Sequence, residues 1–103
     1  MVRDIKSTAE FQHLIASGRK VVVHFQKPLA EPCRRFVPKF DAFSQDHPET
    51  DFVAVDIELL PEVARIAEIE AIPTVKAYQS NRVVHWHVGG GVDDLQYLVG
   101  RFD

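Results

Sequence analysis

Thiol chemistry in this sequence depends on one residue, Cys33, because no other cysteine is present. Disulfide reduction by the dithiol route needs two sulfurs: one attacks the target, and the other resolves the mixed disulfide that results. A single cysteine also excludes an internal disulfide and a cysteine-rich zinc site. Cys33 is therefore either a buried, inert thiol or a single reactive one, and we favour the inert thiol because lone cysteines are most often packing residues.

The histidines are the next candidates for chemistry. His85 and His87 flank Trp86 in a predicted strand, so both project from one face. That spacing can hold a metal ion, but zinc sites typically need three or four protein ligands, and no third ligand is evident nearby. We therefore interpret the pair as part of a solvated strand face and expect no metal and no other cofactor. Val84, Trp86 and Val88 share the other face of that strand, and we expect them to lie in the core.

Length and composition indicate one small domain. The 103 residues suffice for a single hydrophobic core, so residues 1–103 are expected to form one domain. The net charge is −3 and Arg34-Arg35 is the only tight basic pair, so nucleic acid is not an expected partner. No stretch approaches the length of a membrane span, and Met1–Lys6 does not resemble a signal peptide. The sequence thus predicts a soluble, cytoplasmic monomer that does not contact membranes.

Hydrophobic periodicity and helix-start residues predict an alternation of strands and helices. Val21–Phe25 is a nearly continuous apolar run, typical of a strand covered on both faces. Phe36, Phe40 and Phe43 lie on one helical stripe, in which Pro38 is expected to produce a kink. This order predicts an α/β fold, a mixed central sheet with helices on both faces. The predicted elements are a strand at 2–5, a helix at 7–18, a strand at 21–25, a helix from about 32 to 45, a strand at 52–57, a short helix from 61, a hairpin of strands at 74–78 and 83–88, and a helix from 92 to 102.

Four short segments form an ordered series along the chain. They are Val21–Phe25 before a loop, Glu31-Pro32-Cys33-Arg34 with Pro38 five residues after the cysteine, Ala71-Ile72-Pro73-Thr74, and Val88-Gly89 before the last helix. Each segment alone is weak evidence. Together, in this order and at this spacing, they resemble the thioredoxin family over essentially the whole chain. The resemblance implies a thioredoxin fold.

The resemblance also implies a peptide groove. In thioredoxins the proline that matches Pro73 is a cis-proline at the floor of the active site, and the backbone just before it pairs with a bound peptide by strand addition. The alternative for Pro73 is a simple proline at the start of a strand. The implied partners are protein or peptide thiols and disulfides, and glutathione. The groove would be formed by Leu29, Ala30, Glu31, Pro32, Ile72, Pro73 and Gly89, beside Cys33.

The residues around this groove depart from the family pattern. Family members usually have Trp-Cys-Gly-Pro-Cys where this chain has Leu29–Cys33, so Ala30 stands in place of the attacking cysteine. His24 replaces the acid usually buried beneath the second cysteine, and Ala54 replaces the lysine that often accompanies that acid. Dithiol activity is therefore predicted to be absent. The concurrent changes favour natural divergence over an engineered Cys→Ala substitution.

Two classes of function remain open. If His24 lies beneath the sulfur of Cys33, its imidazole could accept the thiol proton and form a thiolate–imidazolium pair. The chain would then be a protein of cell redox homeostasis with monothiol chemistry at most, and with Cys33 and His24 as its catalytic residues. The interpretation of His24 that we favour is a neutral core histidine hydrogen-bonded to the backbone. The other class of function is a non-catalytic binding module that holds a peptide or protein in the groove.

Overall fold

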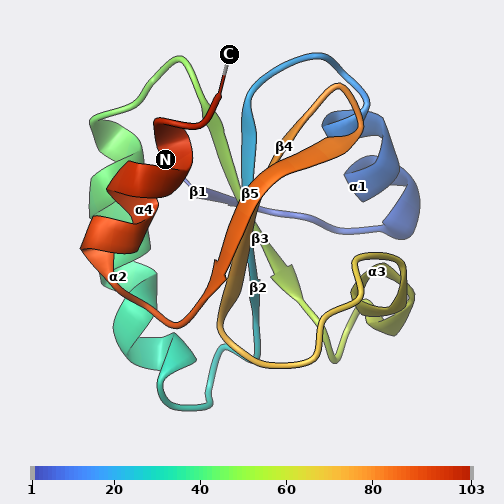
Figure 1. Ribbon diagram of the computed structural model, residues 1–103. Helices are drawn as coiled ribbons and strands as arrows, with labels where there is room; N and C mark the ends of the chain where they lie inside the picture. Colours follow the sequence, from blue (N-terminus) through green and yellow to red (C-terminus); the bar gives the residue numbers. More distant parts are fainter. Residues whose placement is uncertain (1, 103) are drawn as a thin grey trace.

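A five-stranded mixed β-sheet forms the centre of the computed structural model, which describes residues 2–102 (Figure 1). Its strands lie in the order β1 (Val2–Asp4), β3 (Asp51–Asp56), β2 (Val21–Gln26), β4 (Thr74–Gln79) and β5 (Arg82–Val88). β1 and β2 run parallel to β3, whereas β4 is antiparallel to both β2 and β5. The predicted mixed sheet is confirmed.

Helices cover both faces of this sheet (Figure 1). α2 (Cys33–Gln45) and α4 (Val92–Val99) lie on one face, and α1 (Thr8–Ile15) and α3 (Pro61–Ile66) lie on the other. A separate hydrophobic core fills the space between each helix pair and the sheet. The predicted arrangement is therefore confirmed. Within residues 2–102, no helix has the length and apolar content that crossing a membrane requires.

The central strand β2 contributes to both cores, and all six of its residues are buried. Val22, His24 and Gln26 face α2 and α4, because alternate side chains of a strand point to opposite faces. The intervening residues belong to the core beneath α1 and α3. The face covered by α2 thus carries two buried polar side chains of one strand, His24 at 1% exposure and Gln26 at 7%.

Local sequence signals account for the ends of the helices. Ser7 caps α1, and its Oγ accepts a hydrogen bond from the backbone N–H of Glu10 at 3.1 Å. Pro61 opens α3, where the missing N–H of a proline costs nothing. α2 begins at Cys33, one residue later than predicted, with Pro32 as its N-cap, and it contains Pro38. These boundaries place the single thiol in the first turn of α2.

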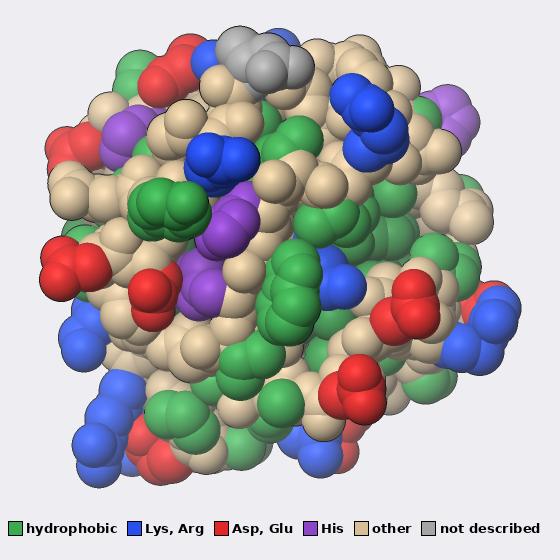
Figure 2. All heavy atoms as spheres, viewed as in Figure 1, with side chains coloured by type: hydrophobic (Ala, Val, Ile, Leu, Met, Phe, Trp, Pro, Cys, Tyr) green, Lys and Arg blue, Asp and Glu red, His purple; other side chains and the backbone are tan. Residues whose placement is uncertain are grey.

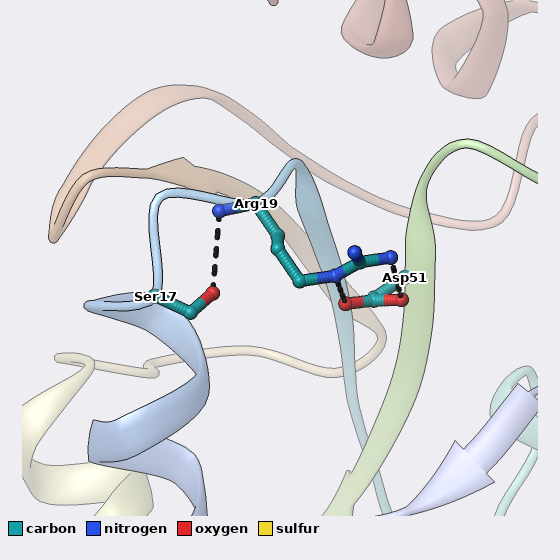
Figure 3. Close-up of polar contacts among 3 residues, drawn as sticks. All are labelled: Ser17, Arg19 and Asp51. Carbon is teal, nitrogen blue, oxygen red and sulfur yellow. Dashed lines mark hydrogen bonds and ion pairs between the residues drawn. The ribbon is translucent and has the colours of Figure 1, made fainter.

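A fork-like contact fixes the turn after α1 to the start of β3 (Figure 3). Arg19 Nε donates to Asp51 Oδ2 at 2.6 Å, and a terminal guanidinium nitrogen donates to Oδ1 at 3.0 Å. The backbone N–H of Asp51 also donates to the carbonyl of Lys20 at 2.9 Å. These contacts hold β2 beside β3 at the end of the sheet opposite the loop that precedes α2.

An irregularity in β5 changes the faces predicted for its side chains. Val83 pairs with Tyr78 and His85 pairs with Ala77, so Val84 is an extra residue at a shift in register. Val84 packs against the core beneath α2 and α4. Beyond the bulge, Trp86 is 55% exposed and Val88 is 52% exposed. The prediction that Trp86 and Val88 lie in the core with Val84 is therefore wrong.

Candidate functional site

The segment from Lys27 to Cys33 connects β2 to α2 and carries the thiol. The backbone N–H of Ala30 donates to the carbonyl of Lys27 at 3.0 Å, and that of Arg34 donates to the carbonyl of Ala30 at 2.9 Å. The loop therefore continues directly into the first turn of α2. Cys33 has no exposed surface, whereas Leu29 four residues earlier is 88% exposed. The loop thus presents an accessible apolar side chain, whereas the thiol at its end is fully buried.

Glu31 and Pro32 form the exposed rim of this loop. The peptide bond between them is cis. Glu31 forms ion pairs with Arg34 at 3.2 Å and with Arg35 at 2.9 Å, both of which lie in the first turn of α2. The carboxylate of Glu31 is thus held over the start of the helix, and it places a charged cluster at the mouth of the predicted groove.

Pro73, just before β4, and Gly89, just after β5, lie next to each other. The Ile72–Pro73 bond is cis, and Pro73 is buried while Ile72 is partly exposed. The N–H of Gly89 donates to the carbonyl of Pro73 at 2.9 Å. Gly89 has a φ of +106°, a backbone conformation that residues other than glycine rarely adopt. A Cβ at Gly90 would lie 2.9 Å from Cδ1 of Phe36, so this glycine lets the loop after β5 pass close to α2.

The strand register brings these segments to one edge of the sheet. Phe25 pairs with Thr74, and Thr74 pairs with Val88. The loop after β2, the segment before β4 and the loop after β5 therefore emerge at the same end of the sheet (Figure 1). The structure thus places the residues predicted for the groove in three segments around one edge.

His24 is a core histidine in this structure. Its ring lies 4.8 Å from that of Phe36 and 5.3 Å from that of Phe40, centroid to centroid. Its Nε2 finds no hydrogen-bond partner among residues 2–102, Cys33 included. Burial lowers the pKa of His24 from 6.5 to about 4, because a charged imidazole would lose its hydration there. His24 is therefore neutral at physiological pH, which agrees with the interpretation favoured from the sequence, although Nε2 lacks the hydrogen bond expected there.

A hollow of about 370 Å³ lies beside the loop tip, between Lys27–Ala30 and the end of β3. Asp56 and Glu58 line its far side. Asp56 Oδ1 accepts hydrogen bonds from the N–H groups of Glu58 at 2.9 Å and Leu59 at 3.3 Å, which fixes the turn after β3. The sequence alone does not indicate that these acids face the loop of Ala30, because that proximity depends on how β2 and β3 pair.

His85 and His87 lie between β5 and α4, beside a hydrophobic strip along β5 (Figure 2). The ring of His85 packs edge-on against Tyr97 of α4 at 4.9 Å. Burial lowers the pKa of His87, and the nearby carboxylate of Asp94 opposes that shift. The shared face is as predicted, but α4 half-buries it, so it is not a solvated strand face. Within residues 2–102, no group of three potential metal ligands comes together.

Comparison with protein families matches residues 3–99 to the family described as thioredoxin. Thioredoxin-1 of Saccharomyces cerevisiae is 34% identical over 89 residues, which cover 86% of each chain. Thioredoxin 1 of Plasmodium falciparum is 28% identical over 102 residues, which cover 99% of this chain and 98% of that relative. The family match extends over nearly the whole sequence and includes every residue predicted for the groove.

Solved structures agree with this assignment. The X-ray structure of Fasciola hepatica thioredoxin superposes with a TM-score of 0.91 at 28% identity, and the match covers 98% of this chain and 99% of that one. The structure of Plasmodium falciparum thioredoxin gives a TM-score of 0.90 at 27% identity, and covers 98% and 99% of the two chains. The fold predicted from four short segments is therefore confirmed in three dimensions.

Proposed function

Because this chain belongs to the thioredoxin family yet has a single, fully buried cysteine, we propose that it binds an extended segment of a partner protein and does not reduce disulfides by the dithiol route. The binding site of this proposal is the groove beside Pro73. The observation that carries it is the zero exposure of Cys33 next to a highly exposed Leu29. An incoming disulfide could not contact the sulfur while Cys33 stays fully buried.

The geometry of the groove supports strand addition. The N–H of Gly89 donates a hydrogen bond to the carbonyl of Pro73, and this bond connects the two segments that would form the sides of the groove. Leu29 offers an apolar contact from the loop side, and Ile72 offers backbone groups just before the cis-proline. An extended peptide could pair with that backbone and place alternate side chains against the loop. Neither contact requires a sulfur atom.

A second candidate function is monothiol exchange in cell redox homeostasis, and the position of Cys33 favours it. The thiol is the first residue of α2, where free N–H groups and the helix dipole stabilise a thiolate. Reaction with a protein disulfide or with glutathione disulfide would form one mixed disulfide and release the other sulfur as a thiolate. This route requires the first turn of α2 to open, because Cys33 is sealed. His24 would assist only as a neutral base beneath the helix.

An insulin-reduction assay separates these functions. With dithiothreitol as the reductant, the unaltered chain and Cys33→Ser should both remain at the uncatalysed rate. Ala30→Cys restores the second sulfur, and a rate that rises only in Ala30→Cys would show that the fold can still support dithiol chemistry. Catalysis by the unaltered chain that Cys33→Ser abolishes would contradict the binding proposal and favour monothiol exchange.

Peptide selection tests the groove directly. Extended peptides enriched from a random display library should shift the backbone NMR signals of Leu29, Ile72 and Gly89. Ile72→Asp should weaken their binding at least about tenfold, because covering the new carboxylate with apolar peptide side chains would remove its hydration. Cys33→Ser, which leaves the groove surface unchanged, is the matched control and should bind normally. Peptides that map elsewhere, or that require the thiol, would contradict the proposal.

A further inference from the structure

A second concave site lies on the α2 face, away from the groove. Three residues of neighbouring strands form one row there, because Asp4 of β1 pairs with Ala54 of β3 and Ala54 pairs with His24 of β2. The small side chain of Ala54 leaves space between the two larger ones. The resulting hollow has a volume of about 300 Å³ and is bordered by residues of α2. We name it the Ala54 hollow; it is lined by Val2, Asp4, His24, Gln26, Val37, Pro38, Phe40, Asp41 and Ala54.

Two side chains of the Ala54 hollow carry buried polar atoms without a partner. His24 Nε2 and Gln26 Oε1 make no hydrogen bond within residues 2–102, although both residues are more than nine-tenths buried. A buried polar group that lacks a partner costs about 1–3 kcal/mol. Two such atoms beside one hollow indicate that a molecule other than the described residues forms hydrogen bonds with them. The oxygen of Gln26 accepts hydrogen bonds only, so its partner must be a donor.

The acidic and basic residues that line the Ala54 hollow are two aspartates. Asp4 is exposed at its mouth, and Asp41 enters from α2. Asp41 has only long contacts, from the N–H of Val2 at 3.4 Å and from the amide of Gln45 at 3.4 Å. No Lys or Arg is among the residues described as lining the hollow. Lys6 borders the adjoining hollow together with Asp4 and Gln26, but the charged groups that line the Ala54 hollow itself are two carboxylates, which favour a cation over an anion there.

We propose that the Ala54 hollow binds a primary alkylammonium group. An ammonium head has three N–H donors, which match Gln26 Oε1, an acceptor nitrogen of a neutral His24, and one of the two carboxylates. Its alkyl stem would pack against the apolar wall that α2 supplies through Val37 and Pro38. A metal ion fits less well, because the described residues offer no group of three metal ligands. Neither Cys33 nor any residue predicted for the peptide groove lines this hollow.

NMR titration tests the proposal with three small probes. Ethylammonium should produce saturable shifts of the His24 ring and Gln26 side-chain amide signals. Tetramethylammonium carries the same charge without N–H donors, and ethanol has a donor without charge; both should bind at least about tenfold more weakly, which is a difference of about 1.4 kcal/mol. A lysine derivative, Nα-acetyl-lysine methylamide, distinguishes the source: tighter binding than ethylammonium would point to a lysine of a partner protein, and weaker binding to a free amine.

Asp4→Asn is the variant of choice because Asp4 is exposed, so the fold should tolerate the change. It should weaken ethylammonium binding at least about threefold, since one of the two carboxylates is lost. Asp46→Asn removes an exposed charge at the end of α2, outside the hollow, and should leave the affinity unchanged. The proposal is overturned if ethylammonium gives no saturable shifts, if tetramethylammonium binds equally well, or if the two variants weaken binding to the same extent.

Discussion

On the α1/α3 face of the sheet, β2 presents Val23 and Phe25 to a core of aliphatic and aromatic side chains, whereas on the α2/α4 face the same strand presents His24 and Gln26. All four side chains are buried. The apolar pair gains stability from contact with its neighbours, but the polar pair keeps atoms without partners at a cost in free energy. Polar groups retained at such a cost are typical of faces where function has limited the choice of residues. The sealed thiol of Cys33 and the Ala54 hollow lie on that same face.

The largest expected effect belongs to the apolar face. Phe25→Ala should lower the free energy of unfolding by about 3–5 kcal/mol, because it leaves a cavity beneath α1. Phe25 is fully buried, and the centroid of its ring lies 6.1 Å from that of Phe11. Urea titration followed by circular dichroism measures the loss. Phe25→Leu is the matched control and should cost less than half as much. A loss below about 1.5 kcal/mol for Phe25→Ala would mean that this core is not the main source of stability.

The next effect concerns the sealing of Cys33. Alkylation by iodoacetamide should be at least about a hundredfold slower in the native protein than in the denatured chain, because the reagent reaches the buried thiol only when α2 unfolds locally. Mass spectrometry of the modified fraction over time gives both rates. Native and denatured rates within a factor of about three of each other would instead describe an accessible thiol and favour monothiol exchange.

Acid should act through the polar face. The native pKa of His24 is lowered to about 4, so the unfolded chain binds its proton first as the pH falls through 6.5. The free energy of unfolding is therefore unaffected by His24 above about pH 6.5. It falls progressively as the pH drops from 6.5 to about 4, because only the unfolded chain gains the proton in that range. Between about pH 7.5 and about pH 5 the loss should be about 2 kcal/mol.

Urea titrations at several pH values, with His24→Leu as the reference, isolate this contribution. His87 also has a lowered pKa, so the informative quantity is the difference between the two proteins and not the slope of either one. Equal pH dependence in both would show that His24 has no part in acid sensitivity, and a steeper dependence in His24→Leu would reverse the assignment.

Local signals were sufficient to predict the elements and the end of the sheet where the residues predicted for the groove come together. The cap at Ser7, the N1 proline at Pro61 and the glycines after β5 each specify local backbone geometry, and such geometry can be inferred from residue type. The proline before β4 is cis, as the family resemblance implied. These features depend on few neighbours in the sequence.

The features that the sequence did not reveal depend on pairing between strands. The extra residue Val84 moves Trp86 to the exposed face, and nothing in the alternation of β5 marks that bulge. The Ala54 hollow needs Asp4, Ala54 and His24 in one row, although they come from three separate strands. A parallel register of this kind is fixed by packing across the whole sheet and leaves no local pattern.

The smallest expected change in the free energy of unfolding comes from replacing a polar residue of β2 by an apolar one on the α2/α4 face. His24→Leu should change the free energy of unfolding at neutral pH by less than about 1 kcal/mol, because an apolar side chain of similar size replaces a ring whose Nε2 has no partner among residues 2–102. Val23→Thr makes the reverse change on the opposite face and should cost about 1–3 kcal/mol, since its hydroxyl would be buried among apolar side chains. A cost for His24→Leu as large as that for Val23→Thr would show that His24 has a stabilising partner, and the contrast between the faces of β2 would then fail.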